Sequence, residues 1–169
     1  MRVEATIDYT RFVKRKPSYS SAAVLVVDDE AIALTVATEL LKRIGFAEIN
    51  SAPNGLSARA MLEEKKYGLI ISDWNMPEMN GLDLLRLVRT DERFKKTPFM
   101  MTSIDGSLER VKIARLSGVS SFLLKPFDET TLRTKLEEVF QQAARLDRPP
   151  PEKIRRPVQP DDAGDLDLD

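Results

Sequence analysis

The feature that most constrains the fold is a repeated alternation between short apolar runs and amphipathic stretches. Four apolar runs, bounded by turn residues or charges, are typical of strands buried on both faces: residues 22–28, 68–72, 97–102 and 120–125. A weaker run at 47–52 is predicted to lie nearer a sheet edge. Because parallel neighbours need right-handed crossovers, this alternation predicts a doubly wound α/β fold, a five-stranded parallel sheet with helices on both faces.

Two of the stretches between strands have a clear helical period. The first places apolar residues on one helix face and is followed by the helix-stop residue Gly45; its members are Ala33, Val36, Ala37, Leu40, Leu41 and Ile44. The second follows Asp128, a predicted N-cap, and contains Leu132, Leu136, Val139, Phe140 and Ala143. Three less regular helices are expected at 56–66, 82–90 and 107–117.

Composition excludes several kinds of chemistry. The 169 residues correspond to one domain with appendages. The chain has no cysteine and no histidine, which excludes thiol catalysis, disulfides, Ser-His-Asp nucleophiles and imidazole metal ligands. Any bound metal must therefore use oxygen ligands, and these favour a hard cation such as Mg²⁺.

Charge and hydropathy indicate the kind of partner and the organisation of the chain. A net charge of −1 predicts no nucleic-acid partner, and no stretch approaches the length of a membrane span. We expect a cytoplasmic protein without a signal peptide. The predicted organisation is an N-terminal extension at 1–22, a folded domain at 23–146 and a flexible, Pro-rich acidic tail at 147–169.

Chemically active side chains stand where the predicted strands end. Asp28 and Asp29 follow the first strand, Asp73 the third, Thr102 ends the fourth and Lys125 ends the fifth. In an open parallel sheet ligands bind beyond the carboxyl ends of the strands, so these groups should converge on one edge. Clustered carboxylates repel one another unless a cation neutralises them, which predicts a Mg²⁺ site with an ionised, nucleophilic aspartate.

Each of these residues also has a simpler interpretation. Asp28 and Asp29 could cap the first helix, and Asp73 could start a turn before Pro77. Thr102 alone would usually fill a strand, and Lys125 alone would usually be a solvated charge. Their conjunction at successive strand ends favours a functional site.

The segments that carry these residues resemble the response-regulator receiver (CheY-like) family. They are VLVVDDE (24–30), LIISDWNMPEMNGLDLL (69–85), PFMMTS (98–103) and SSFLLKPF (120–127), and the resemblance covers about residues 23–145. It implies a flavodoxin-like (βα)₅ fold with strand order 2-1-3-4-5.

The resemblance also assigns roles at the metal site. Asp73 is similar in position to the phosphoacceptor. Asp28 and Asp29 match the metal-site acids for Mg²⁺ or Mn²⁺, with Asp29 the direct ligand and Asp28 acting mainly through water. Asp73 and the backbone carbonyl of Asn75 complete the expected ligands.

Further positions match the residues that act on the phosphoryl group and the switch. Thr102 matches the switch hydroxyl, Lys125 the phosphate-contacting lysine, with a cis bond to Pro126, and Phe122 the switch aromatic. Phe122 departs from the chemotaxis pattern, which has tyrosine there. Asn80 replaces a frequent aspartate and is expected to be structural.

The predicted function is therefore a two-component response regulator, a phosphoacceptor that catalyses only its own phosphorylation and slow dephosphorylation. Its expected partners are a sensor histidine kinase or histidine phosphotransfer protein and a downstream protein that binds the switched surface at 107–145; homodimerisation is left open. The alternatives are a phosphorelay shuttle and a pseudo-receiver scaffold that is never phosphorylated. Three other functions fit less well. A flavin-binding protein is disfavoured because the acidic segment DDEAIA would repel phosphate without a metal, and a dinucleotide enzyme because the GxGxxG motif is missing. An aspartyl-nucleophile phosphatase would have its second acid two residues after the first, whereas the acids after the first strand here are adjacent.

Overall fold

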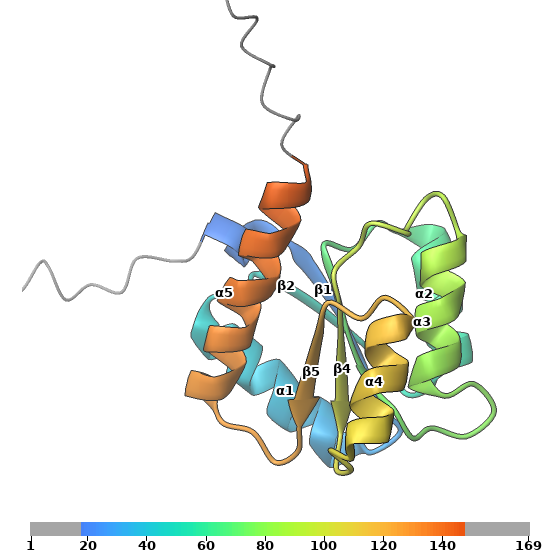
Figure 1. Ribbon diagram of the computed structural model, residues 1–169. Helices are drawn as coiled ribbons and strands as arrows, with labels where there is room; N and C mark the ends of the chain where they lie inside the picture. The colour runs from blue at the N-terminus through green and yellow to red at the C-terminus, as the bar shows by residue number, and fades with distance from the viewer. Residues whose placement is uncertain (1–17, 148–169) are drawn as a thin grey trace, which may run out of the picture.

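The computed structural model describes residues 18–147 and consists of a parallel sheet between two layers of helices (Figure 1). The strand order is β2-β1-β3-β4-β5, and every neighbouring pair is parallel. The strands are β1 (Ala23–Val27), β2 (Glu48–Ala52), β3 (Leu69–Asp73), β4 (Phe99–Ser103) and β5 (Ser121–Leu124). The predicted doubly wound fold is confirmed, with the weak strand β2 at one edge.

A helix follows each strand, and the first four helices return the chain to the start of the next strand. The helices are α1 (Ala31–Ile44), α2 (Gly55–Glu64), α3 (Gly81–Thr90), α4 (Leu108–Leu116) and α5 (Glu129–Leu146). Helices α1 and α5 cover one face of the sheet, and α2, α3 and α4 cover the other (Figure 1). None of the helices among residues 18–147 is both long and apolar enough to cross a membrane.

The residues expected to begin and end helices do so. Gly45 ends α1 in the left-handed conformation, with φ of 116°, which glycine adopts without the strain that a Cβ would bring. The side chain of Asp128 accepts a hydrogen bond from the N–H of Thr131 and so caps α5. Asn80 does the same for α3 through the N–H of Asp83, which confirms its structural role.

The prediction for the face of α1 was wrong at one residue. Ala37, Leu41 and Ile44 are buried against the sheet, but Val36 is 50% exposed. Val36 lies in the part of α1 that borders an open groove near Phe127, so no side-chain layer covers it fully.

A short 3-10 helix, Ser18–Ser21, precedes β1 and packs on the domain. The ring of Tyr19 stacks on Phe140 of α5 with centroids 4.7 Å apart and lies 5.6 Å from Phe46. Part of the extension predicted at 1–22 thus belongs to the packed region. The remainder of that extension and the predicted flexible tail at 148–169 lie outside the described residues, and the domain boundaries stay a prediction.

Candidate phosphoacceptor and metal site

Strand β1 delivers two adjacent carboxylates to the carboxyl edge of the sheet. Asp28 is 4% exposed; its Oδ1 accepts a hydrogen bond from the N–H of Glu30 at 3.0 Å, and its Oδ2 accepts one from Lys125 at 2.5 Å. Asp29 is exposed. The N-cap of α1 is Glu30, whose side chain makes no capping hydrogen bond. The interpretation of Asp28 and Asp29 as helix caps was therefore wrong.

Strand β3 ends in Asp73, which is buried and not the start of an exposed turn. Its backbone carbonyl accepts a hydrogen bond from Ser72 Oγ at 3.0 Å. Helix α3 begins directly behind it, and a Cβ at Gly81 would lie 2.1 Å from that carbonyl oxygen. Only glycine allows α3 to approach the end of β3 this closely.

Lys125 links the two strand ends. Its Nζ lies 2.5 Å from Asp28 Oδ2 and 3.0 Å from Asp73 Oδ1, and its backbone N–H donates to Ser103 at the end of β4. Partial burial alone would lower the pKa of Lys125, but its hydrogen bonds and charge interactions with both carboxylates outweigh burial and raise that pKa. The interpretation of Lys125 as a solvated charge was therefore wrong. The bond between Lys125 and Pro126 is cis, as expected.

For Asp73, burial has a larger effect on the pKa than the interactions with neighbouring groups. Burial is the main effect and raises the pKa of its carboxyl group, with a smaller contribution in the same direction from the charge of Asp28. The hydrogen bond and charge of Lys125 and a backbone hydrogen bond from Asn75 lower that pKa without cancelling the effect of burial. The carboxylate of Asp73 is therefore short of positive charge.

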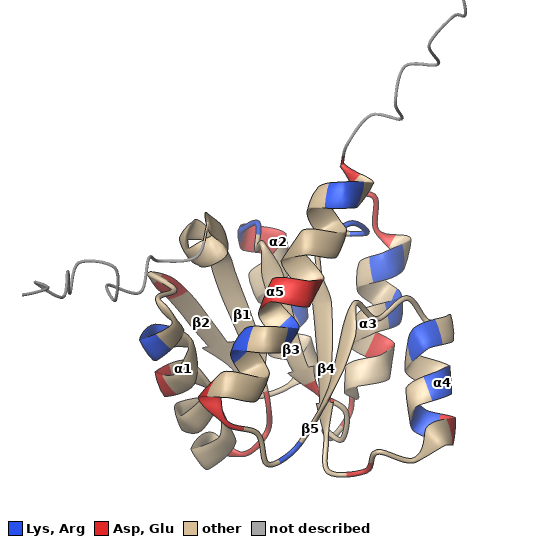
Figure 2. Cartoon of the chain, turned by 60° about the vertical axis from the view of Figure 1, so that its left-hand side comes forward, with Lys and Arg blue, Asp and Glu red and all other residues tan. Residues whose placement is uncertain are grey.

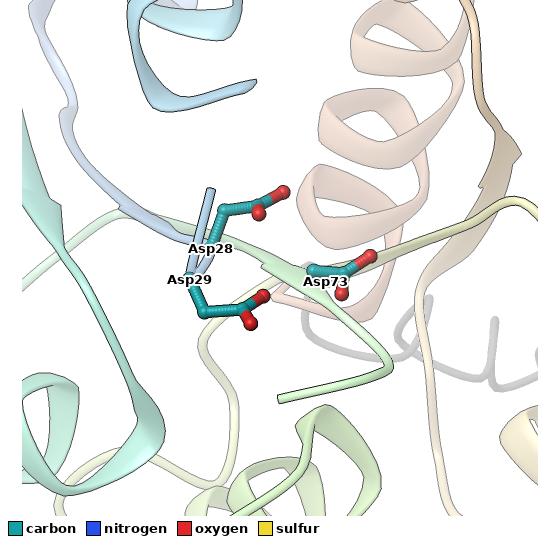
Figure 3. A group of neighbouring side chains, drawn as sticks. All are labelled: Asp28, Asp29 and Asp73. Atoms are coloured by element: carbon teal, nitrogen blue, oxygen red, sulfur yellow. The ribbon is translucent and has the colours of Figure 1, made fainter. Parts of the chain in front are cut away.

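The carboxyl groups of Asp28, Asp29 and Asp73 gather in a geometry suited to a hard cation (Figure 3). One carboxylate oxygen from each lies within 4.8 Å of the others. Lys125 supplies one positive charge against three carboxylates, so the residues present fit Mg²⁺ in both ligand type and charge. The side chains leave the ends of β1 and β3 and project beyond the sheet, where ligands of parallel sheets bind.

The remaining predicted residues surround this cluster. Thr102 is 3% exposed and is the register partner of Asp73, so the two stand side by side on β4 and β3. Phe122 on β5 is partly buried and meets the ring of Trp74 edge-on, with centroids 6.3 Å apart. Asn75 follows Asp73 by two residues and is exposed, and its Oδ1 accepts a hydrogen bond from Arg110 at 3.2 Å.

Sequence reasoning missed two residues of this region, Trp74 and Arg110. Trp74 is 8% exposed and its ring lies under the guanidinium of Arg110, 5.0 Å from centroid to Cζ. An arginine on a helix is usually solvated, and nothing in its local sequence shows which loop it will reach. Its role becomes visible only when α4 is placed beside the loop after β3.

Comparisons with known proteins agree with this geometry. Residues 24–137 match the model of the response regulator receiver domain. Chemotaxis protein CheY1 of Helicobacter pylori is 39% identical over 118 residues, which cover 69% of this chain and 95% of that protein. Chemotaxis protein CheY-3 of Vibrio cholerae is 35% identical over 119 residues, which cover 70% of this chain and 92% of that protein. The structure of the chemotaxis response regulator CheY4 of Vibrio cholerae aligns with a TM-score of 0.66 and 33% identity, covering 70% of this chain and 98% of that one. The chain belongs to the response regulator receiver domain family, whose members act as phosphoacceptor switches in two-component signalling.

Proposed function

We propose that Asp73 accepts a phosphoryl group from a histidine kinase or a histidine phosphotransfer protein, and that the phosphorylated chain signals to a downstream protein. The observation that carries this proposal is the contact of Lys125 with both Asp28 and Asp73, at 2.5 and 3.0 Å, beside the exposed Asp29. This arrangement puts a nucleophile, a phosphate-binding cation and metal-binding carboxylates at one edge of the sheet.

In the proposed reaction an Oδ of Asp73 attacks the phosphorus of a phosphohistidine. A P–O bond forms, the P–N bond breaks, and the leaving imidazole nitrogen takes a proton from solvent. Lys125 holds an oxygen of the transferring group with its ammonium, and the hydroxyl of Thr102 can donate to another. The same geometry permits slow hydrolysis, in which water replaces Asp73 on phosphorus; no other catalysis is proposed.

The metal would be held by Asp28, Asp29, Asp73 and the backbone carbonyl of Asn75. When bound, Mg²⁺ or Mn²⁺ supplies positive charge that offsets the carboxylates and the phosphoryl oxygens. Before it binds, Lys125 contacts both Asp28 and Asp73 and offsets part of their negative charge.

A groove beside the acceptor supports a protein as the phosphodonor. It has a volume of about 340 Å³, extends from Asp28, Thr102 and Lys125 to Phe127, and is largely apolar. Ile32, which lines it, is 79% exposed. Exposed apolar side chains of this kind often mark a protein contact.

The output surface would be formed by α4, β5 and α5. A larger groove of about 760 Å³ lies among these elements, with Phe122 among its lining residues. Leu108 and Leu116 of α4 are 88% and 80% exposed. A movement of Thr102 toward the phosphoryl group and of Phe122 inward would reshape this surface.

The test is incubation of the protein with acetyl phosphate and Mg²⁺, followed by intact-mass measurement. Wild type should gain one phosphoryl group, and Asp73→Asn should gain none. The matched control is Asp83→Asn, which removes an exposed carboxylate of α3 and should label like wild type. Unlabelled wild type, or undiminished labelling of Asp73→Asn, would refute the proposal.

A further inference from the structure

Arg110, in the first turn of α4, makes three contacts around the segment that follows the acceptor. Its Nη1 donates to Asn75 Oδ1 at 3.2 Å, and its Nε lies 3.0 Å from Asp105 Oδ2. Its guanidinium covers the ring of Trp74 at 5.0 Å. These contacts tie α4 to the loop after β3 and to the loop after β4 at the same time.

The segment that Arg110 touches is joined directly to the acceptor. Trp74 donates its backbone N–H to the carbonyl of Thr102 at 2.9 Å, and the backbone N–H of Asn75 acts on the Asp73 carboxylate in the direction that lowers its pKa. The orientation of the peptide at Asn75 therefore affects both Asp73 and the direction of the Asn75 carbonyl.

The contacts are strong enough to influence that orientation. The Arg110 side chain is only 28% exposed, and the guanidinium lies over a ring that is 8% exposed. A cation over an aromatic face contributes about 0.5–2 kcal/mol, and a partly exposed hydrogen bond about 0.5–1.5 kcal/mol. Asn75 itself is exposed, so it has little packing of its own to fix it.

We propose that Arg110 is a positioning residue for phosphoryl acceptance, holding Trp74 and Asn75 so that the Asn75 backbone carbonyl is directed toward the metal site. This inference rests on the proposed function, because it concerns the same acceptor and the same metal. It assigns to α4 a part in assembling the site, in addition to its place on the output surface.

The charge of Arg110 and its positioning role have opposite effects on the affinity for Mg²⁺. A guanidinium near the site repels a divalent cation, so its removal alone would strengthen metal binding. Two substitutions separate the effects. Arg110→Lys keeps the charge but loses the planar group that stacks on Trp74 and reaches Asn75 and Asp105 together, and Arg110→Met loses both.

Lys112 provides the matched control. It is an exposed residue of the same helix, and the blue bands on α4 in Figure 2 mark its Lys and Arg positions. Lys112→Gln removes one positive charge from α4 without touching the loop contacts of Arg110.

The experiment measures Mg²⁺ affinity and phosphorylation rate in the full chain. Trp74 is the only tryptophan in the sequence, so the midpoint of its fluorescence change reports metal binding beside Asp73, with calorimetry as a second measurement. Arg110→Lys should bind Mg²⁺ about three- to tenfold more weakly than wild type, as expected for the loss of one partly exposed hydrogen bond. Arg110→Met should also bind Mg²⁺ more weakly than wild type, but by a smaller factor, because it loses the repelling charge as well. Lys112→Gln should bind as tightly as wild type or slightly more tightly.

The dependence on metal concentration distinguishes positioning from direct contact with the phosphoryl group. At limiting Mg²⁺ the variants should react with acetyl phosphate more slowly by the same factor, and saturating Mg²⁺ should restore the wild-type rate. Wild-type affinity in Arg110→Lys, tighter binding in Arg110→Met, or a rate defect that persists at saturating Mg²⁺ would overturn the inference. If wild type is not labelled at all, the proposed function fails, whereas the Mg²⁺ titration still tests the role of Arg110.

Discussion

Replacing Asp73, the proposed acceptor, by its neutral isostere asparagine should make the metal-free protein more stable. Asp73 is 7% exposed, shares the Lys125 ammonium with Asp28, and has a carboxylate oxygen within 4.8 Å of one from Asp28. Its pKa is raised mainly by burial, which means that the fold favours the neutral form of this side chain. Asparagine supplies that neutral form with almost the same shape.

The distances between the charged groups set the size of this stabilisation. At an effective dielectric constant of 20, the Asp28 carboxylate, with an oxygen within 4.8 Å, repels Asp73 by at least about 3.5 kcal/mol, and the ammonium at 3.0 Å attracts it by about 5.5 kcal/mol. Removing the carboxylate from water costs several kcal/mol, which exceeds this small net attraction. Asparagine can still accept a hydrogen bond from Lys125. We expect Asp73→Asn to raise the free energy of unfolding by about 1–2 kcal/mol at pH 7.

The effect should depend on pH with a definite sign. The folded protein holds the Asp73 proton more tightly than the unfolded chain, whose pKa is near the ordinary 3.8. Below that value both states are protonated and the cost is absent; as pH rises through the higher folded pKa, the cost appears in full. The advantage of Asp73→Asn should therefore be large at neutral pH and vanish in acid.

Urea unfolding with a chelator, repeated across this pH range and in saturating Mg²⁺, measures the effect. Mg²⁺ should stabilise wild type more than Asp73→Asn, because the variant lacks one metal ligand. The control is Asp83→Asn, which removes an exposed carboxylate outside the cluster and should change metal-free stability by less than about 0.5 kcal/mol. A variant less stable than wild type at pH 7 without metal, or an advantage that does not shrink in acid, would refute the reasoning.

Three other substitutions probe the supports of the site. Lys125→Met should lose about 3 kcal/mol of metal-free stability, because Asp28 and Asp73 are left without a cation. The variant should react with acetyl phosphate at least about a hundredfold more slowly than wild type. Because folding raises the Lys125 pKa, the stability difference should persist below pH 10.5 and disappear at higher pH, where the ammonium loses its proton. Gly81→Ala should lose about 3 kcal/mol or more in urea unfolding, because its Cβ would lie 2.1 Å from the Asp73 carbonyl oxygen. Arg89→Met should lose about 2 kcal/mol in the same assay, because the partly buried guanidinium donates to the carbonyls of Gly118 and Thr97 at 2.8 Å. Wild-type stability in either variant would contradict the packing described here.

The sequence predicted the fold well because its signals are local and strong. Central strands β1, β3 and β4 are buried almost throughout, so they appear as unbroken apolar runs. Helix ends were predictable at Gly45 and Asp128, where one residue type has a conformational or hydrogen-bonding advantage. Val36 was misplaced because periodicity identifies a helix face but does not show where the layer covering that face ends.

The candidate site was predictable to the extent that strand ends determine it. The carboxyl edge of a parallel sheet gathers whatever follows each strand, so Asp28, Asp73 and Lys125 could be brought together from sequence order alone. The sequence could not show that Lys125 contacts Asp28 more closely than Asp73, since that depends on side-chain conformation. Arg110 was invisible for a different reason: it reaches the site laterally, from a helix, and lateral contacts leave no periodic signal.

The two kinds of contact also differ in what they can control. A side chain at a strand end, such as Lys125, makes its contacts within the site itself, with Asp28 and Asp73. Arg110 belongs to α4, part of the proposed output surface, and its partners Asn75 and Asp105 lie on two separate loops of the site. If Arg110 supports metal binding, linkage requires that metal binding in turn favour the α4 position that Arg110 adopts. A partner protein that binds α4 in that position would then raise the affinity of the proposed acceptor site for Mg²⁺. By the same factor, bound Mg²⁺ would raise the affinity of this chain for the partner.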